Sequence, residues 1–224
     1  MDEENLGESS TEGQAKLRER MVTEQLIARG IKDERVLAAM RKVPRHCFVP
    51  NESVENTYGD YPMSIGYGQT ISQPYMVAVM TERLLLRGEE RVLEIGTGTG
   101  YQSAVLAELA KEVFSIDRLS ILAESARTLL EELEYKNIRI KSGDGTCGWP
   151  EFSPYDAIIV TAGTPSIPKP LVVQLREGGR MILPVGGNFS QVLTLVEKCK
   201  GKVKEVEFCG CVFVPLVGKY GWQE

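Results

Sequence analysis

The apolar residues near the start of the chain recur at helical spacing. Residues 15–29 carry apolar side chains three or four positions apart, and residues 33–42 repeat the pattern. The spacing predicts two amphipathic helices. Gly30 is expected to end the first helix, and Asp33 to cap the start of the second.

Further along the chain, short apolar runs alternate with helical patterns. Residues 51–73 are predicted to be a loop, and a third helix is predicted from Pro74, where a proline is tolerated in the first turn. Strands are predicted at 91–95, 112–117, 138–141, 155–162, 179–186, 191–198 and 203–216, and helices at 100–110, 119–133 and 168–176. We interpret this order as four strand–helix units followed by strands alone. It predicts an α/β fold with a doubly wound, mostly parallel seven-stranded sheet, an N-terminal helical extension and a C-terminal antiparallel hairpin.

Length and charge refine this organisation. The 224 residues suit one α/β domain. Residues 1–14 contain five acidic residues and no basic residue, which accounts for the formal net charge of −5. We therefore predict a disordered acidic tail at 1–14 and a single domain at 15–224, with an N-terminal part at 15–73 and a core at 74–224.

The balanced charge of the remaining chain disfavours two classes of partner. It offers no basic stripe for nucleic acid. It also lacks an apolar run near the roughly 18 residues of a membrane span and a signal-peptide pattern at the N-terminus. We expect a cytoplasmic monomer that binds neither nucleic acid nor membranes.

The five cysteines are expected to be reduced thiols. Their number is odd and their spacing is not that of a disulfide framework. Cys209 and Cys211 would share one face of a strand, but no second ligand pair accompanies them, so we expect buried core cysteines and no metal site. His46, the only histidine, adjoins Cys47, and adjacent side chains point apart on regular structure, which argues against a catalytic Cys–His pair.

The strongest candidate for chemistry is the motif VLEIGTGTGYQ at 92–102. Gly96, Gly98 and Gly100 form a turn between a predicted strand and a helix, where backbone amides can approach a ligand. Asp117 ends the next strand about twenty residues later, where a carboxylate can hold ribose hydroxyls. These features fit an adenosine-containing cofactor, although a glycine turn can also close a strand for packing alone.

Two details favour one cofactor over another. The glycines have the spacing G-x-G-x-G, whereas the motif of dinucleotide-binding proteins is G-x-G-x-x-G, so the spacing disfavours a dinucleotide cofactor. Glu94 stands just before the first glycine, where it would oppose a pyrophosphate but suit the ammonium group of S-adenosylmethionine. Gly143 and Asp144 belong to a third acidic turn, SGDG, and Asp144 could accept a hydrogen bond from the adenine amino group.

Several stretches resemble a known family. VLEIGTGTGYQSAVLA, SGDG and LREGGRMILPVG resemble class I methyltransferases that use S-adenosylmethionine. PRHCFVP, YPMSIGYGQTISQPYMVA and FVPLVGKYGW narrow the resemblance to the protein-L-isoaspartate O-methyltransferases. The resemblance runs from about residue 15 to the C-terminus. It implies a Rossmann-like methyltransferase fold, with 15–73 holding the N-terminal helices and a substrate loop.

The resemblance also implies an activity and a site. The family methylates the free α-carboxylate of isoaspartyl residues in damaged proteins, and the ester then collapses to a succinimide. By resemblance, Ser72 is the active-site serine, and Thr70, Ile71 and Ser72 bind the substrate. Hydroxyl donors beside free amides at the start of the helix from Pro74 would suit a carboxylate. A bare helix cap at Ser72 remains the alternative.

Rival functions predict features that the sequence lacks. A class I methyltransferase acting on a nucleic acid or another small acceptor is the main alternative. Methylation of a base amine predicts an Asn/Asp-Pro-Pro-aromatic motif after the fourth strand, where TAGTPSIP stands instead. An NAD-dependent oxidoreductase predicts the longer glycine spacing and a proton-relay residue. A third alternative, a non-enzymatic protein that senses an adenosine-containing ligand, is not excluded by the sequence.

Overall fold

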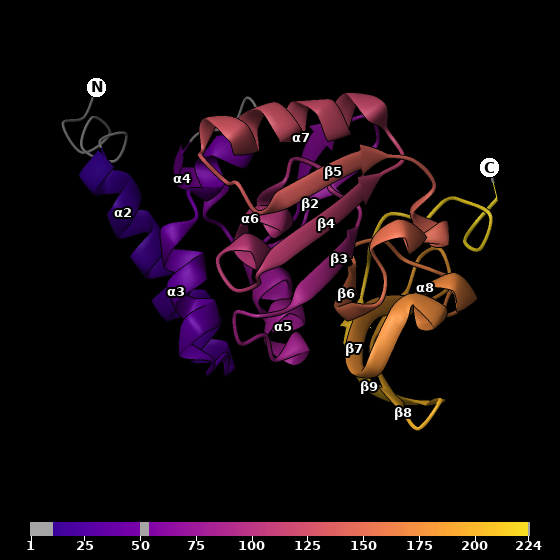
Figure 1. Ribbon diagram of the computed structural model, residues 1–224. Helices are drawn as coiled ribbons and strands as arrows, with labels where there is room; N and C mark the ends of the chain where they lie inside the picture. Colours follow the sequence, from indigo (N-terminus) through magenta and orange to yellow (C-terminus); the bar gives the residue numbers. More distant parts are fainter. Residues whose placement is uncertain (1–10, 50–53, 224) are drawn as a thin grey trace. The chain divides into compact units, whose positions relative to one another are not determined.

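The computed structural model describes residues 11–49 and 54–223, and the chain divides into two units, residues 1–82 and 83–224. Figure 1 shows both units with most of their helices and strands labelled. The first ten residues of the predicted tail lie outside the described residues. The predicted division of the domain at 73/74 stays a prediction.

The first unit is mainly helical. Its elements are α2 (Thr11–Arg20), η1 (Met21–Leu26), η2 (Ile27–Arg29), α3 (Glu34–Lys42), η3 (Arg45–Phe48), α4 (Val54–Thr57), β1 (Met63–Gly66), β2 (Gln69–Ile71) and most of α5 (Pro74–Leu84). The cap at Asp33 is confirmed, because its side chain accepts hydrogen bonds from the amides of Arg35 and Val36. Gly30 ends the preceding helical run in a left-handed conformation.

The first helical run differs from the prediction in two ways. It begins at Thr11, whereas residue 15 was predicted, and it contains a π-helical turn at η1. In a straight α-helix, Leu17 and Leu26 would point to opposite sides, because nine residues at 3.6 per turn leave a half-turn difference. The wider π turn allows both side chains to be buried.

The predicted loop at 51–73 contains a β-hairpin, so that expectation was wrong for its second half. β1 and β2 pair antiparallel, with Met63 opposite Ile71 and Ser64 opposite Thr70. Alternate residues of β1 are buried. The strands have only four and three residues and are joined by Tyr67 and Gly68, so they are too short for their alternation to be recognised in the sequence.

The second unit is built around a seven-stranded sheet, as predicted. Its strands are β3 (Arg91–Ile95), β4 (Glu112–Asp117), β5 (Ile138–Ser142), β6 (Tyr155–Val160), β7 (Leu175–Gly186), β8 (Gln191–Cys199) and β9 (Lys202–Cys211), in the order β5-β4-β3-β6-β7-β8-β9. β3 to β7 are mutually parallel, and β7, β8 and β9 pair antiparallel. The helices are α6 (Tyr101–Ala107), α7 (Ser120–Glu132) and α8 (Lys169–Gln174). The first contacts β4, the second contacts β4 and β5, and the third contacts β7.

Two local predictions in this unit were wrong. The connection from β5 to β6 contains only the short 3-10 turns η4 (Gly145–Cys147) and η5 (Pro150–Phe152), because Pro150, Pro154 and a glycine interrupt any longer helix. β9 ends at Cys211, whereas the strand was predicted to reach residue 216. The chain then turns to form an isolated bridge between Gly163 and Pro215.

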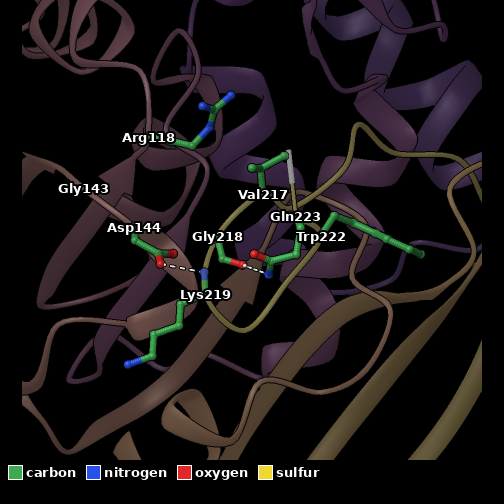
Figure 2. Close-up of a pocket in the computed structure, with 8 residues that line it drawn as sticks. All are labelled: Arg118, Gly143, Asp144, Val217, Gly218, Lys219, Trp222 and Gln223. Carbon is green, nitrogen blue, oxygen red and sulfur yellow. Dashed lines mark hydrogen bonds between the residues drawn. The ribbon is translucent and has the colours of Figure 1, made fainter.

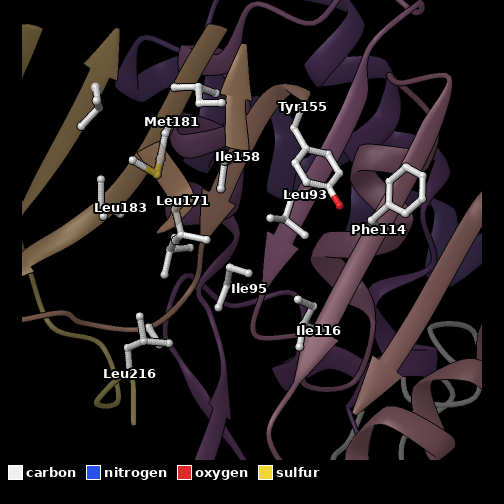
Figure 3. Close-up of a cluster of buried hydrophobic side chains, with 14 residues drawn as sticks. Leu93, Ile95, Phe114, Ile116, Tyr155, Ile158, Leu171, Met181, Leu183 and Leu216 are labelled. Carbon is white, nitrogen blue, oxygen red and sulfur yellow. The ribbon is translucent and has the colours of Figure 1, made fainter. Parts of the chain in front are cut away.

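The core of this unit covers one face of the sheet. Figure 3 shows side chains from neighbouring parallel strands, such as Leu93, Phe114 and Ile158, together with Leu171 from α8. Leu93 and Ile95 of β3 both belong to this cluster, so Glu94, which lies between them, points to the opposite face. Strand residues that point away from this cluster, such as Glu94, are therefore the ones that can contribute to a site.

The expectation of buried core cysteines was wrong. Cys209 is exposed and Cys211 is partly buried, because β9 is the edge strand and most of its residues are exposed. All five cysteines are free thiols. No group of three or more His, Cys, Asp or Glu side chains in the described ranges could hold a metal ion. None of the described helices is both long and apolar enough to cross a membrane.

Candidate functional site

Ser72 lies in a short connection between β2 and α5. Ile71 ends the strand and is buried, Ser72 is partly buried, and the helix begins at Pro74. The hydroxyl groups of Thr70 and Ser72 make no hydrogen bond to a described residue. Thr70 is exposed on the hairpin. Both hydroxyls are therefore available to a ligand.

Ser72 is not the residue that starts the helix. The carbonyl oxygen of Gln73 accepts hydrogen bonds from the amides of Met76 and Val77 at 3.1 and 3.2 Å, which places the N-cap at Gln73. The alternative that Ser72 serves only as a helix cap loses its support, because its hydroxyl caps no described amide.

The expectation of free amides at the start of α5 was wrong. Pro74 has no N–H, and the amide of Tyr75 donates to Oδ1 of Asp60 at 2.9 Å. The next two amides are taken by Gln73. A carboxylate from the chain already occupies the helix N-terminus, so a substrate carboxylate cannot use these donors. The sequence showed no signal for this, because Asp60 is fifteen residues from Tyr75.

The predicted glycine turn joins β3 to α6 in the second unit. Gly96, Gly98 and Gly100 all have positive φ angles, at 99°, 55° and 92°. A Cβ atom on Gly96 would collide with the hydroxyl of Thr161, so only glycine fits there. The Thr161 hydroxyl donates to the carbonyl oxygens of Ile95 and Gly96, at 3.0 and 2.8 Å, and ties the turn to the end of β6. The turn follows the carboxyl end of a parallel strand, which is where open α/β sheets bind ligands.

Glu94 is fully buried beside this turn. It is in register with Ser115 on β4, and its Oε2 accepts hydrogen bonds from the hydroxyls of Ser115 (2.7 Å) and of Ser103 on α6. Burial raises the pKa of Glu94 to about 8, and the charge of Asp117 adds to this rise, although the two serine hydrogen bonds oppose it. Its Oε1 is buried with no hydrogen-bond partner among the described residues. A buried oxygen without a partner is costly, and a cationic group would compensate it.

Asp117 ends β4 and is almost fully buried. Its Oδ2 accepts from the amide of Gly98 at 2.8 Å, and its Oδ1 accepts from the amide of Leu119 at 2.9 Å. The carboxylate therefore braces the glycine turn. Each oxygen still has capacity for a further hydrogen bond, such as one from a ribose hydroxyl.

Gly143 and Asp144 follow β5 and line a pocket of about 440 Å³ (Figure 2). The pocket is closed on another side by Val217 to Lys219, Trp222 and Gln223 of the C-terminal segment, which we define as residues 212–223. Arg118, next to Asp117, completes the lining. Of the predicted cofactor-binding residues, only Gly143 and Asp144 line this pocket, and the turn after β4 contributes Arg118.

Asp144 holds the C-terminal segment in place. Its Oδ2 accepts from the amide of Lys219 at 2.9 Å, as Figure 2 shows, and its Oδ1 caps η4 through Thr146. Burial raises the pKa of Asp144, but hydrogen bonds from Thr146 and from the Lys219 amide outweigh it and leave the pKa below its ordinary value. The carboxylate therefore has a structural role that the sequence did not reveal.

Sequence reasoning missed Ser103, Ser115 and Thr161. Ser115 had a weak signal, since a serine in an otherwise apolar strand must satisfy its hydroxyl in the interior. Ser103 lies in a predicted helix and Thr161 near the end of a predicted strand, and only the fold brings them to Glu94 and the glycine turn.

His46 has a partner other than Cys47. Its Nδ1 lies 2.7 Å from the hydroxyl of Tyr58, which also accepts from Arg18 at 3.3 Å. Burial lowers the pKa of His46, and the charge of Arg18 lowers it further. Burial raises the pKa of the Cys47 thiol, which makes it a poor nucleophile.

Comparison with known proteins identifies relatives over almost the whole described chain. A family model described as protein-L-isoaspartate(D-aspartate) O-methyltransferase matches residues 17–221. The protein-L-isoaspartate O-methyltransferase 1 of Syntrophobacter fumaroxidans is 57% identical over 208 residues, which cover 93% of this chain and 97% of that protein. The protein-L-isoaspartate O-methyltransferase of Methanoculleus marisnigri is 55% identical over 206 residues, covering 92% of this chain and 94% of the relative.

Solved structures give the same result. A protein-L-isoaspartate O-methyltransferase aligns with a TM-score of 0.83 and 32% identity, over 91% of this chain and 67% of the other. A putative protein-L-isoaspartate O-methyltransferase from Plasmodium falciparum, in complex with S-adenosyl-L-homocysteine, aligns with a TM-score of 0.79 and 26% identity, over 89% of this chain and 98% of the other.

Proposed function

Because this chain belongs to the protein-L-isoaspartate(D-aspartate) O-methyltransferase family, we propose that Ser72 is the residue that holds the acceptor carboxylate during methyl transfer. The enzyme uses S-adenosylmethionine to methylate the free α-carboxylate of L-isoaspartyl residues in damaged proteins and peptides. The ester then collapses to a succinimide, which starts repair. The family match over residues 17–221 is the observation that carries this function.

The reaction needs little acid–base chemistry from the protein. An α-carboxyl group has a pKa of about 3.5, so the acceptor is already an anion at neutral pH. S-adenosylmethionine supplies a methyl group activated by a positively charged sulfur. A carboxylate oxygen forms a bond to the methyl carbon as the carbon–sulfur bond breaks, and both charges disappear. The protein must therefore align the acceptor and exclude water, without a general base.

Ser72 suits the alignment of the acceptor. Its hydroxyl is free of described partners and stands directly after a paired strand, so it can donate to one carboxylate oxygen. Thr70 and Ile71 precede it, and we propose that the exposed Thr70 hydroxyl and the backbone of this stretch contact the substrate as well. Since the amides of α5 are occupied, the hydroxyl donors carry the recognition.

The residues of the second unit suit the cofactor. We propose that the unpartnered Oε1 of Glu94 lies toward the ammonium group of the methionine part, that the glycine turn approaches the same part through its backbone, and that Asp117 accepts from the ribose hydroxyls. Gly143 and Asp144 would border the adenine. The donor set matches this ligand because a buried acidic group compensates a cation and would repel a pyrophosphate.

Replacing Ser72 tests the proposed role. Ser72→Ala should lower turnover on an isoaspartyl peptide by at least about tenfold and leave the affinity for S-adenosylmethionine unchanged, because only acceptor alignment is lost. Ser64→Ala, on the opposite strand of the same hairpin, is the matched control and should keep wild-type turnover. Full activity of Ser72→Ala per folded molecule would exclude the proposed role.

We further infer that the enzyme is a cytoplasmic monomer that acts on isoaspartyl proteins and binds neither nucleic acid nor membranes. The five free thiols suit a reducing compartment. The edge strand β9 carries charged residues, among them Lys202, Lys204, Glu205 and Glu207, and charges on an edge strand oppose strand pairing between copies. Sedimentation of the purified protein as a dimer would contradict the monomer.

A further inference from the structure

Asp60 contacts both sides of the helix start that follows Ser72. Its Oδ1 accepts from the amide of Tyr75 at 2.9 Å, and its Oδ2 accepts from the side-chain amide of Gln73 at 3.0 Å. The same Oδ2 forms an ion pair with Arg29. The carboxylate is mostly buried, with 17% of the side chain exposed.

Arg29 balances the charge of Asp60. Its guanidinium carbon lies 3.5 Å from the centroid of the Tyr75 ring, so it is held between the ring and the carboxylate. Arg29 ends η2, which joins the helical run at the start of the chain to this cluster. An unbalanced carboxylate here would repel an incoming carboxylate, and the Arg29 pair reduces that repulsion.

The contacts of Asp60 determine how the connection after β2 is held. On one side of Ser72, Ile71 is fixed by its pairing with Met63. On the other side, Gln73 and Tyr75 are fixed by Asp60. Since the Ser72 hydroxyl bonds to no described residue, the direction of this side chain depends on the backbone between these two anchors.

We propose that Asp60, balanced by Arg29, is a positioning residue for Ser72. It fills the N-terminus of α5 so that the helix start is rigid and the acceptor carboxylate is directed to the serine hydroxyl. This inference rests on the role of Ser72 proposed above. Asp60 would act through the backbone that carries Ser72, by way of its contacts with Gln73 and Tyr75.

Replacing Asp60 separates positioning from stability. Asp60→Ala should lower kcat on an isoaspartyl peptide by at least about tenfold at saturating S-adenosylmethionine, because small misplacement of a reacting group has effects of this size or larger. The dissociation constant for S-adenosylmethionine should stay within about twofold of wild type, since ground-state binding of the cofactor is untouched. Asp60→Asn keeps an oxygen acceptor for the Tyr75 amide and should recover part of kcat.

Asp33→Ala is the matched control. Asp33 is a carboxylate that caps α3 in the same unit through two backbone amides. Its loss should lower the melting temperature about as much as Asp60→Ala and leave kcat unchanged. Equal kcat losses in both variants, or wild-type kcat per folded molecule in Asp60→Ala, would overturn the inference.

Measuring Ser72→Ala on the same peptide distinguishes the two proposals. An impaired Ser72→Ala beside an active Asp60→Ala would remove only the positioning role. A fully active Ser72→Ala would remove the role of the serine itself, and the positioning role with it.

Discussion

Glu94 is a residue whose burial lowers the stability of the free enzyme and suits the binding of a cationic ligand. Its side chain is fully buried, two serine hydroxyls stabilise one oxygen, and the other oxygen has no partner in the described chain. Burying an acid with one unpartnered oxygen costs stability in the absence of a ligand. The buried acid is instead suited to a positively charged ligand, which would lower its pKa and supply the missing interaction.

The raised pKa predicts a pH-dependent stability without cofactor. The folded-state pKa of Glu94, about 8, lies above its unfolded value of about 4.5. The stability that protonated Glu94 contributes is therefore fully present below pH 4.5 and is lost as the pH rises through 8. Glu94→Gln cannot ionise and lacks this loss. Denaturant unfolding of both proteins between pH 5 and 9 should show the variant gaining relative stability up to about pH 8. A difference that stays constant over this range would contradict the burial of an ionisable group.

Single residues also show where sequence reasoning reaches its limit. Glu94, the three glycines and Asp117 were predicted to bind the cofactor because they lie at or just after the carboxyl ends of two strands, at a characteristic spacing. The partners that hold them, such as Ser103 and Thr161, come from other elements and leave no local pattern. Asp60 went unnoticed for the same reason, and its contact with Tyr75 reversed the expectation of free helix amides.

At the scale of elements, the strands were predicted best. The limits of β3 and β4 agree with the predicted ranges, because each is a short segment rich in apolar residues that begins among charged residues. The hairpin of β1 and β2 was missed, since three or four residues carry too little alternation. The connection between β5 and β6 was misread as part of a strand–helix unit, although its prolines and glycine indicate irregular structure.

The short helix α8 depends on a distant lysine. Nζ of Lys198, on β8, donates to the carbonyl oxygens of Val172 and Leu175 at 2.9 and 2.7 Å and so caps the C-terminal end of the helix. A cation at this end also interacts favourably with the helix dipole.

Removing this cap should reduce stability. Lys198→Met is expected to lower the free energy of unfolding by about 2 kcal/mol, the typical value for a hydrogen bond to a charged group, since several weaker contacts do not add fully. Lys204→Met, at an exposed position of β9, should change it by less than about 0.5 kcal/mol. Equal losses in the two variants, measured by denaturant titration, would show that the contacts of Lys198 contribute nothing.

For the whole molecule, the sequence predicted the class of sheet and the antiparallel end, because the alternation of strands and helices follows general rules of chain connection. It did not predict how distant segments close the pocket. Asp144 and Lys219 are 75 residues apart, and their hydrogen bond is created only by the fold. The activity could still be predicted from the family resemblance, because the matched stretches span both units of the chain.

We infer that this enzyme distinguishes isoaspartyl from normal aspartyl residues by the position of one carboxylate. In the isomer the chain leaves through the side-chain carbonyl, and the free α-carboxylate sits on an arm shorter by one methylene. If Ser72 holds the acceptor as proposed, its hydroxyl can align only one of the two arrangements, and misplacement by about 1 Å can cost about a hundredfold in rate.

The most direct test is methyl transfer from S-adenosylmethionine to two peptides that differ only in this linkage. The isoaspartyl peptide should be methylated, and the aspartyl peptide should react at least about a hundredfold more slowly under the same conditions. Equal rates on the two peptides would contradict the assignment.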